Sequence, residues 1–313
     1  MRFGIMGTGG VGGYYGGMLA RAGAEVCLIA RGDHLTAMRR EGLRVESVES
    51  GDFTVRDVFL TDDPAEAGVC DVLFLCVKTT ANEAAIPAIA PMVGPDTTII
   101  SLQNGIDNAE QIAAFHGKER VMGGAVYIFS SLKGPGRVLQ VDGPRRIVFG
   151  ELEGGGNERG GRILSALRSA EIDAVLSEDI QAELWTKFIF ICAVNGMTAL
   201  TRSPLGALLS YEGTERMLRE TMREVEAVGR AVGVSLPDGK EEERIKSLRA
   251  AGHDSKGSMC HDLEAGRRLE IDGQCGAVSR LGKEAGVPTP LNDFLYGALK
   301  LADLRNAGEP ISP

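Results

Sequence analysis

The chain has 313 residues, 43% of them hydrophobic, and a formal net charge of −9 at pH 7. This length exceeds what one hydrophobic core usually supports, so we expect two domains. The acidic balance, and the lack of a basic stripe, argue against nucleic acid or an anionic membrane as the main partner.

A glycine-rich turn follows the first apolar run. We predict a short strand at residues 3–6 and a helix of small side chains at residues 14–22, and the glycine-rich turn joins the two. Its residues are Gly7, Thr8, Gly9, Gly10, Val11 and Gly12. A GxGxxG turn in this context permits a tight bend, lets the backbone approach a pyrophosphate and packs a helix closely on a strand. We predict a dinucleotide site here; the alternative is a strand-to-helix turn that binds no ligand.

The second predicted strand, residues 25–30, is followed by Arg31 rather than by an acidic residue. Asp or Glu there would accept a hydrogen bond from the ribose 2′-hydroxyl of NAD, whereas a guanidinium can pair with the 2′-phosphate of NADP. The sequence therefore favours NADPH over NADH. The alternative is an ordinary solvated arginine, because arginine is mostly exposed in proteins.

Apolar runs at residues 72–77 and 98–102 are typical of strands buried on both faces of a parallel sheet. Between residues 43 and 60, the spacing of the apolar residues shortens around residues 50–52. This pattern predicts a hairpin added at the sheet edge. The first half therefore predicts a doubly wound, mostly parallel sheet.

Turn residues separate three further segments, which predict antiparallel additions to the sheet at 124–131, 136–141 and 146–149. The turns fall at residues 133–136 and 142–144. A helix after residues 154–157 and a short strand at 174–176 complete this half.

Two polar residues stand just after predicted strands, where open α/β sheets bind their ligands. Lys78 follows the run at 72–77, and Asn104 follows the run at 98–102 by way of Gln103. We expect both near the nicotinamide end of the cofactor. The alternatives are a solvated lysine at a helix start and an Asn-Gly turn.

After residue 177 the pattern changes to helices only. We therefore predict a Rossmann NADP-binding domain at residues 1–177 and an all-helical substrate and catalytic domain at residues 178–313. The first helix of the second domain, residues 179–195, is apolar almost all round after Trp185, so we expect it to be buried.

Lys187 lies in this apolar helix, where an ammonium is costly and its pKa shifts toward the range useful for acid-base catalysis. Asn195 lies eight positions on, on roughly the same face. The alternative is that Glu183 and Lys187, four positions apart, form only a surface ion pair.

A polar cluster near the end begins with a predicted helix at 258–264, in which Ser258 and Asp262 share a face. A charged stretch at 266–273 follows it. Taken alone, this pattern is typical of a capped helix followed by a charged loop as well as of a functional cluster. Periodicity does not distinguish these two interpretations.

The six cysteines contain no CxxC pair and lie mostly in apolar runs, so we expect reduced thiols and a cytoplasmic protein. We expect no signal peptide, because the first strand begins within two residues of Met1. The longest apolar stretch, residues 188–194, is too short to span a bilayer. The four histidines form no ligand-spaced set, so we expect no metal.

Together these segments resemble the ketopantoate reductase (2-dehydropantoate 2-reductase) family over the whole chain. The matching segments are the GxGxxG turn with Arg31, the strand before Lys78, residues 103–105, residues 182–187 through Asn195 and 198–200, and residues 269–273. The resemblance implies a Rossmann domain followed by an all-helical domain, with the substrate in the cleft between them. It also implies NADPH-dependent reduction of a 2-oxo acid, with ketopantoate reduced to pantoate on the route to pantothenate and coenzyme A.

The resemblance implies roles for individual residues. Lys187 matches the catalytic lysine, which supplies the proton as the ketone accepts a hydride. Glu270 matches the glutamate that orients this lysine or bonds the product hydroxyl. Asn104, Asn195 and Ser258 match polar residues that hold the substrate. Lys78 matches a lysine near both the substrate and the cofactor, and Asn104 and Glu270 are also expected beside the cofactor.

Two departures bear on the substrate. Ile191 stands where the family commonly has an asparagine, and Thr79-Thr80-Ala81 replaces the usual polar partner after Lys78. A lost amide removes a hydrogen bond that discriminates substrates. Ile191 points to one alternative, a reductase of another, more apolar 2-oxo acid. A catalytically silent NADPH-binding protein is a further alternative, against which Lys187 and Glu270 argue. A homodimer through the helical domain is expected by family analogy alone.

Overall fold

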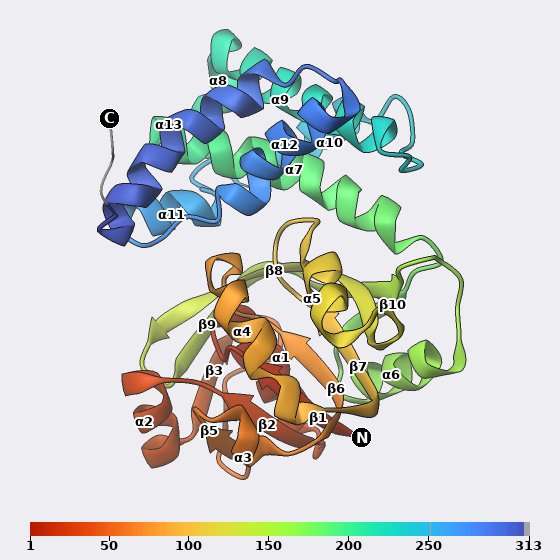
Figure 1. The fold of residues 1–313 in the computed structure, drawn as a ribbon. Helices are drawn as coiled ribbons and strands as arrows, with labels where there is room; N and C mark the ends of the chain where they lie inside the picture. Colours follow the sequence, from red (N-terminus) through yellow and green to blue (C-terminus); the bar gives the residue numbers. More distant parts are fainter. Residues whose placement is uncertain (251, 310–313) are drawn as a thin grey trace. The chain divides into compact units, whose positions relative to one another are not determined.

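The computed structural model describes residues 1–250 and 252–309, apart from the side chain of residue 142. The chain divides into two compact units, and Figure 1 labels their helices and most of their strands. Unit 1 is Met1–Gln103 and Asn108–Glu183, and unit 2 is Asn104–Asp107 and Leu184–Pro313. The functional boundary expected between residues 177 and 178 stays a prediction.

Unit 1 is built on a ten-stranded sheet whose strand order is β4-β3-β9-β8-β7-β6-β1-β2-β5, with β10 paired to β9. The strands are β1 (Arg2–Met6), β2 (Glu25–Ile29), β3 (Leu43–Ser47), β4 (Phe53–Val55), β5 (Phe59–Thr61), β6 (Cys70–Leu75), β7 (Val93–Ser101), β8 (Val121–Gly134), β9 (Arg137–Glu151) and β10 (Asp173–Leu176). From β5 to β8 every neighbouring pair is parallel. The strand order reverses between β1 and β6, which is where doubly wound sheets bind ligands.

Helices cover both faces of this sheet because successive strand side chains point to opposite sides. Phe3 and Ile5 of β1 enter a core shared with α1, α2 and α6, whereas Met6 enters a second core shared with α3, α4 and α5. The helices are α1 (Gly10–Arg21), α2 (Gly32–Glu41), α3 (Pro64–Ala67), α4 (Asn82–Ala88), α5 (Asn108–His116) and α6 (Glu158–Ser169). Short 3-10 turns are η1 (Thr79–Ala81), η2 (Ala90–Met92) and η3 (Lys118–Arg120). Burial on both faces explains the continuous apolar runs.

The hairpin predicted at residues 43–60 is confirmed only in part. β3 and β4 pair antiparallel at one edge of the sheet. β5 (Phe59–Thr61), however, pairs parallel with β2 at the opposite edge. A three-residue strand carries too little pattern to specify its partner, so including residues 59 and 60 in the hairpin was wrong.

The antiparallel additions are confirmed, but the turn predicted at residues 142–144 is wrong. β9 is one continuous strand, and its pairing with β8 shifts between Ile128↔Arg145 and Ser130↔Gln140. This bulge sets several extra residues of β9 against the gap in β8. Gly143 adopts φ +122° there, a conformation that glycine allows, so it accommodates the bulge and the strand continues through it.

Unit 2 is helical around a single apolar core. Its elements are α7 (Ile180–Thr201, whose first turn belongs to unit 1), α8 (Leu205–Ser210), α9 (Glu212–Ala231), α10 (Glu241–Ala250), α11 (Ser258–Glu264), the π-helical turn η4 (Asp272–Gly276), α12 (Ala277–Ala285) and α13 (Pro290–Ala307). The predicted fold class, an α/β Rossmann unit followed by an all-helical unit, is confirmed.

Helix α7 is longer than the apolar stretch at residues 188–194 suggested. It has 22 residues, and by length and composition it could cross a bilayer. Of its most apolar window, 67% is buried inside the protein, and a core helix of a soluble protein passes the same test. Trp185, Phe188, Ile189 and Cys192 all contribute to the core of unit 2.

Candidate active site

The glycine-rich turn lies at the carboxyl end of β1, beside the point where the strand order reverses. The backbone N–H and side-chain hydroxyl of Thr8 both donate to the carbonyl oxygen of Ile29, at 3.1 and 3.0 Å. These bonds fasten the turn to the end of β2. Helix α1 then begins at Gly10, and none of the described side chains caps its first amides.

The geometry of this turn fits a dinucleotide pyrophosphate. Gly7 has φ +99°, which side-chain-bearing residues rarely adopt. A Cβ at Gly12 would lie 2.2 Å from the carbonyl oxygen of Gly7, so the helix approaches the strand too closely for any side chain. A Cβ at Gly9 would meet nothing within 4 Å, so the turn leaves open space in front of the helix. Open space beside uncapped amides is what a phosphate group requires.

Arg31 occupies the N-cap position of α2, directly after β2 and Ala30. Its side chain is exposed, and no carboxylate in the described part of the chain forms an ion pair with it. A guanidinium at this strand end can receive a phosphate without first releasing a protein partner.

Lys78 is exposed at the start of η1, three residues after β6. The backbone before it is held by Gln103, whose amide nitrogen donates to the carbonyl oxygen of Val77 at 2.8 Å and to Asn82 Oδ1 at 2.6 Å. Asn82 in turn donates to Asn108 at 3.0 Å. The ends of β6 and β7 are therefore tied together by buried amides.

In unit 2, the ammonium of Lys187 donates a hydrogen bond to Asn104 Oδ1 at 2.9 Å. Lys187 lies on α7 and is partly buried. Burial lowers its pKa from 10.5 to about 8, although the negative charge of Glu270 opposes this shift. Glu270 itself is only 5% exposed. The structure thus brings together three residues that the sequence predicted for one site.

Asn195 lies two turns after Lys187 on α7 and is 4% exposed. Its amide nitrogen donates to Gln274 Oε1 at 2.9 Å. Gln274 stands in the π-helical turn η4, four residues after Glu270. Its own amide nitrogen is buried and has no hydrogen-bond partner among residues 1–250 and 252–309. A buried bond of this kind fixes which way the Asn195 amide faces.

Ser258 is exposed at the first position of α11. The residue before it, Gly257, packs directly on α7: a Cβ at this position would lie 2.2 Å from Asn195 Oδ1. Its N–H donates to Thr198 Oγ1 at 3.1 Å. The start of α11 is therefore fastened to α7 beside Asn195, which brings Ser258 into the same neighbourhood.

Ile191 lies one turn from both Lys187 and Asn195 and is partly exposed. Residues four positions apart share a helix face, so this face carries a cation, an aliphatic side chain and an amide in succession. An aliphatic group at this point offers contact to a hydrocarbon part of a ligand and no hydrogen bond.

One contributor to the site, Gln274, was missed from sequence, and it acts through Asn195. Gln103 and Thr198 were noted only as part of the resemblance, with no role given to them. A glutamine or threonine in an apolar stretch carries no distinctive spacing, so only its hydrogen bonds reveal its role. Among residues 1–250 and 252–309, no group of three or more His, Cys, Asp or Glu side chains could hold a metal ion.

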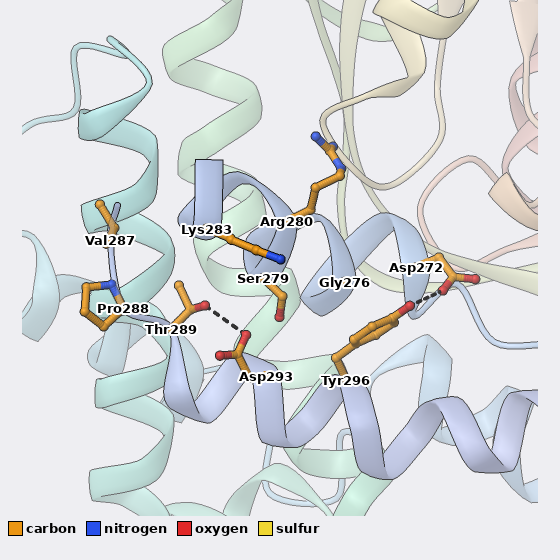
Figure 2. Close-up of a pocket in the computed structure, with 10 residues that line it drawn as sticks. All are labelled: Asp272, Gly276, Ser279, Arg280, Lys283, Val287, Pro288, Thr289, Asp293 and Tyr296. Atoms are coloured by element: carbon orange, nitrogen blue, oxygen red, sulfur yellow. Dashed lines mark hydrogen bonds between the residues drawn. The ribbon is translucent and has the colours of Figure 1, made fainter. Parts of the chain in front are cut away.

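Unit 2 also has a hollow of about 700 Å³ between α12 and α13 (Figure 2). Its lining residues are Asp272, Gly276, Ser279, Arg280, Lys283, Val287, Pro288, Thr289, Asp293 and Tyr296. None of the residues predicted for the active site lines it.

Two family models, described as ketopantoate reductase PanE/ApbA and its C-terminal part, match residues 3–154 and 179–303. A 2-dehydropantoate 2-reductase of Mesorhizobium japonicum is 33% identical, over 96% of this chain and 97% of that protein. The crystal structure of a PanE/ApbA family ketopantoate reductase from Ralstonia eutropha JMP134 superposes with a TM-score of 0.90 and 35% identity, over 98% of this chain and all of that one.

A D-mandelate dehydrogenase crystallised with NADH and anilino(oxo)acetate has the same fold. Its TM-score is 0.87 at 24% identity, over 98% of this chain and all of that one. At that identity the likeness establishes the architecture alone.

Proposed function

Because the chain belongs to the ketopantoate reductase family, whose members are oxidoreductases acting on CH–OH groups, we propose that it reduces ketopantoate to pantoate with NADPH. The observation that carries this proposal is the partly buried Lys187, bonded to Asn104 and subject to the charge of Glu270. A cation held in this way is suited to neutralise an alkoxide as it forms.

Bound NADPH would supply the hydride to the carbonyl carbon of the 2-oxo acid. Lys187 supplies the proton to the carbonyl oxygen and becomes a neutral amine, which then takes a proton from water. With a pKa of about 8, the ammonium is largely protonated near neutral pH and releases its proton more readily than an ordinary lysine. Asn104 favours the charged form of Lys187 because its oxygen accepts a hydrogen bond from the ammonium. Glu270 favours the charged form through its negative charge.

For the cofactor, we assign the pyrophosphate to the first amides of α1 and the 2′-phosphate to Arg31. Lys78, at the start of η1, follows the strand next to β1 in the sheet and is assigned to the cofactor as well. Asn104 and Glu270 are expected beside the nicotinamide. This assignment is supported by the open space at Gly9 and the absence of an ion-pair partner for Arg31 in the described residues.

For the substrate, we assign Asn195 and Ser258 as polar contacts, since Gly257 joins their two helices. Ile191 favours a second candidate, a reductase of a different, more apolar 2-oxo acid, because it supplies only a hydrocarbon surface on this face. A cytoplasmic location and a homodimer stay predictions.

A steady-state assay with purified protein tests these assignments. NADPH oxidation is followed with ketopantoate and with a panel of branched and aromatic 2-oxo acids, and each reaction is repeated with NADH. We expect the highest kcat/KM for NADPH with ketopantoate. A higher value for another 2-oxo acid would establish the second candidate. Binding of NADPH without turnover of any 2-oxo acid would overturn both, and would favour a silent binding protein.

A further inference from the structure

The segment Asn104–Asp107, which we call the strap, joins β7 to α5 of unit 1 yet clusters with unit 2. Both of its neighbours, Gln103 and Asn108, are buried in unit 1. Four residues between two anchored elements have few conformations, so their contacts decide where the Asn104 side chain lies.

The strap makes three kinds of contact within unit 2. Asn104 Oδ1 accepts the hydrogen bond from Lys187 at 2.9 Å. Ile106 packs, partly buried, on the apolar core of unit 2. Asp107 Oδ2 accepts a hydrogen bond from Arg280 Nη2 of α12 at 2.7 Å. A polar, an apolar and an ionic contact thus follow one another along the strap.

Arg280 is among the residues that line the hollow, and its guanidinium bonds Asp107 of the strap. Figure 2 shows its guanidinium extending away from the hydrogen-bonded pair of Thr289 and Asp293. Its second carboxylate partner, Glu284, lies one turn later on α12 at the longer distance of 3.4 Å. Since Arg280 is always charged, it holds Asp107 at any pH at which that carboxylate is ionised.

We propose that Arg280 is a positioning residue that, by holding Asp107, seats the strap so that Asn104 stays within hydrogen-bond distance of Lys187. This rests on the proposed role of Lys187 as proton donor. Gly105, with φ +103°, provides the bend that lets the strap satisfy both ends. Arg280 touches neither substrate nor cofactor in this role. It acts by keeping the acceptor of the catalytic ammonium in place.

The ion pair is well suited to a clean test, because the side chains of Arg280 and Asp107 are 48% and 26% exposed. A pair this exposed contributes little to folding, so its removal leaves the fold intact. The variants are Arg280→Met and Asp107→Asn, with Glu284→Ala as the matched control that removes only the other partner of Arg280.

We expect Arg280→Met and Asp107→Asn each to lower kcat by about tenfold, with the KM of the 2-oxo acid and the Kd of NADPH within about twofold of the wild type. The double variant should fall no further, because both changes break one link. Glu284→Ala should match the wild type. Equal effects of Arg280→Met and Glu284→Ala, or a normal Asp107→Asn, would overturn the proposal.

A second measurement does not depend on turnover. Nuclear magnetic resonance titration of lysines labelled at Cε, with Lys187→Met to assign the signal, reports the pKa of Lys187 directly. Losing the Asn104 acceptor removes a bond to the charged form, so this pKa should fall in Arg280→Met and stay unchanged in Glu284→Ala. The charge of Glu270 is common to all these variants. A protein that reduced no 2-oxo acid would refute the proposed function. An unchanged Lys187 pKa in Arg280→Met would instead refute the proposal that Arg280 positions Asn104 through the strap.

Discussion

At the scale of single residues, Lys187 is the decisive group, because opposing influences set its charge. Removal from water disfavours the ammonium, while Glu270 and the Asn104 oxygen favour it. The resulting pKa of about 8 lies close to physiological pH, where a general acid works most efficiently. An exposed lysine at the same position would hold its proton too firmly.

The pH dependence of the reaction follows from this value. A general acid must carry its proton, so kcat/KM for reduction should be constant below pH 7 and fall as pH rises through about 8. Oxidation of the 2-hydroxy acid should show the opposite slope, because it needs the neutral amine. Lys187→Met should lower kcat by roughly 10²- to 10⁴-fold and abolish this titration. A profile for reduction that stays flat from pH 7 to 9.5 would contradict the assignment.

At the scale of elements, the entry into α1 depends on how closely it approaches β1. The Cβ that Gly12 lacks would meet a backbone oxygen, which cannot rotate away as a side chain can. A Cβ at Gly9, the N-cap residue of α1, would meet none of the described atoms within 4 Å. The same motif therefore contains one glycine required for packing and another that leaves room for a ligand.

A set of three alanine substitutions separates these two requirements. Gly12→Ala should lower the free energy of unfolding by about 1–3 kcal/mol through overpacking. Gly9→Ala should fold normally but bind NADPH more weakly, since its methyl group occupies the space left for the pyrophosphate. Gly161→Ala, in α6 with nothing within 4 Å of the new Cβ, should stabilise the protein by about 0.4–1 kcal/mol. Urea unfolding and NADPH fluorescence titration measure the two properties.

If Gly9→Ala lost stability while its NADPH affinity stayed normal, the turn would serve packing alone. A Gly12→Ala variant that unfolded as the wild type does would contradict the packing requirement at Gly12. Gly161→Ala controls for the general effect of replacing glycine in a helix.

For the whole molecule, two hydrophobic cores in unit 1 and a third in unit 2 support the native state, and a ligand that binds the folded protein raises its stability by mass action. A cofactor present at one hundred times its Kd stabilises the native state by about 2.7 kcal/mol. Cofactor preference can therefore be measured without any substrate.

We expect NADPH to raise the melting temperature more than NADH at equal concentration. Arg31→Ala should reduce the shift with NADPH and leave the shift with NADH unchanged, because only the 2′-phosphate needs the guanidinium. Arg40→Ala, which alters an exposed arginine of the same helix paired with Glu41, is the control and should behave as the wild type. Equal shifts for the two cofactors in the wild type would contradict the preference for NADPH.

Much of the fold could be predicted from sequence because its signals are local. The glycine turn, the buried strands and the apolar helix α7 each depend on a short continuous pattern of residues. The errors came where a choice between distant partners was needed. β5 is too short to specify pairing with β2, and the turn residues at 142–144 suit a bulge as well as a loop.

Local patterns in the sequence are enough to predict the order of the elements, the glycine turn and the types of side chain available for catalysis, because these depend on neighbouring residues and on periodicity. The tertiary structure alone decided that the strap brings Asn104 to Lys187, that Gln274 orients Asn195 and that Arg280 holds Asp107. These partners are between 79 and 173 positions apart. Their contacts arise only after the helices and the sheet have buried their apolar faces, and no short pattern encodes them.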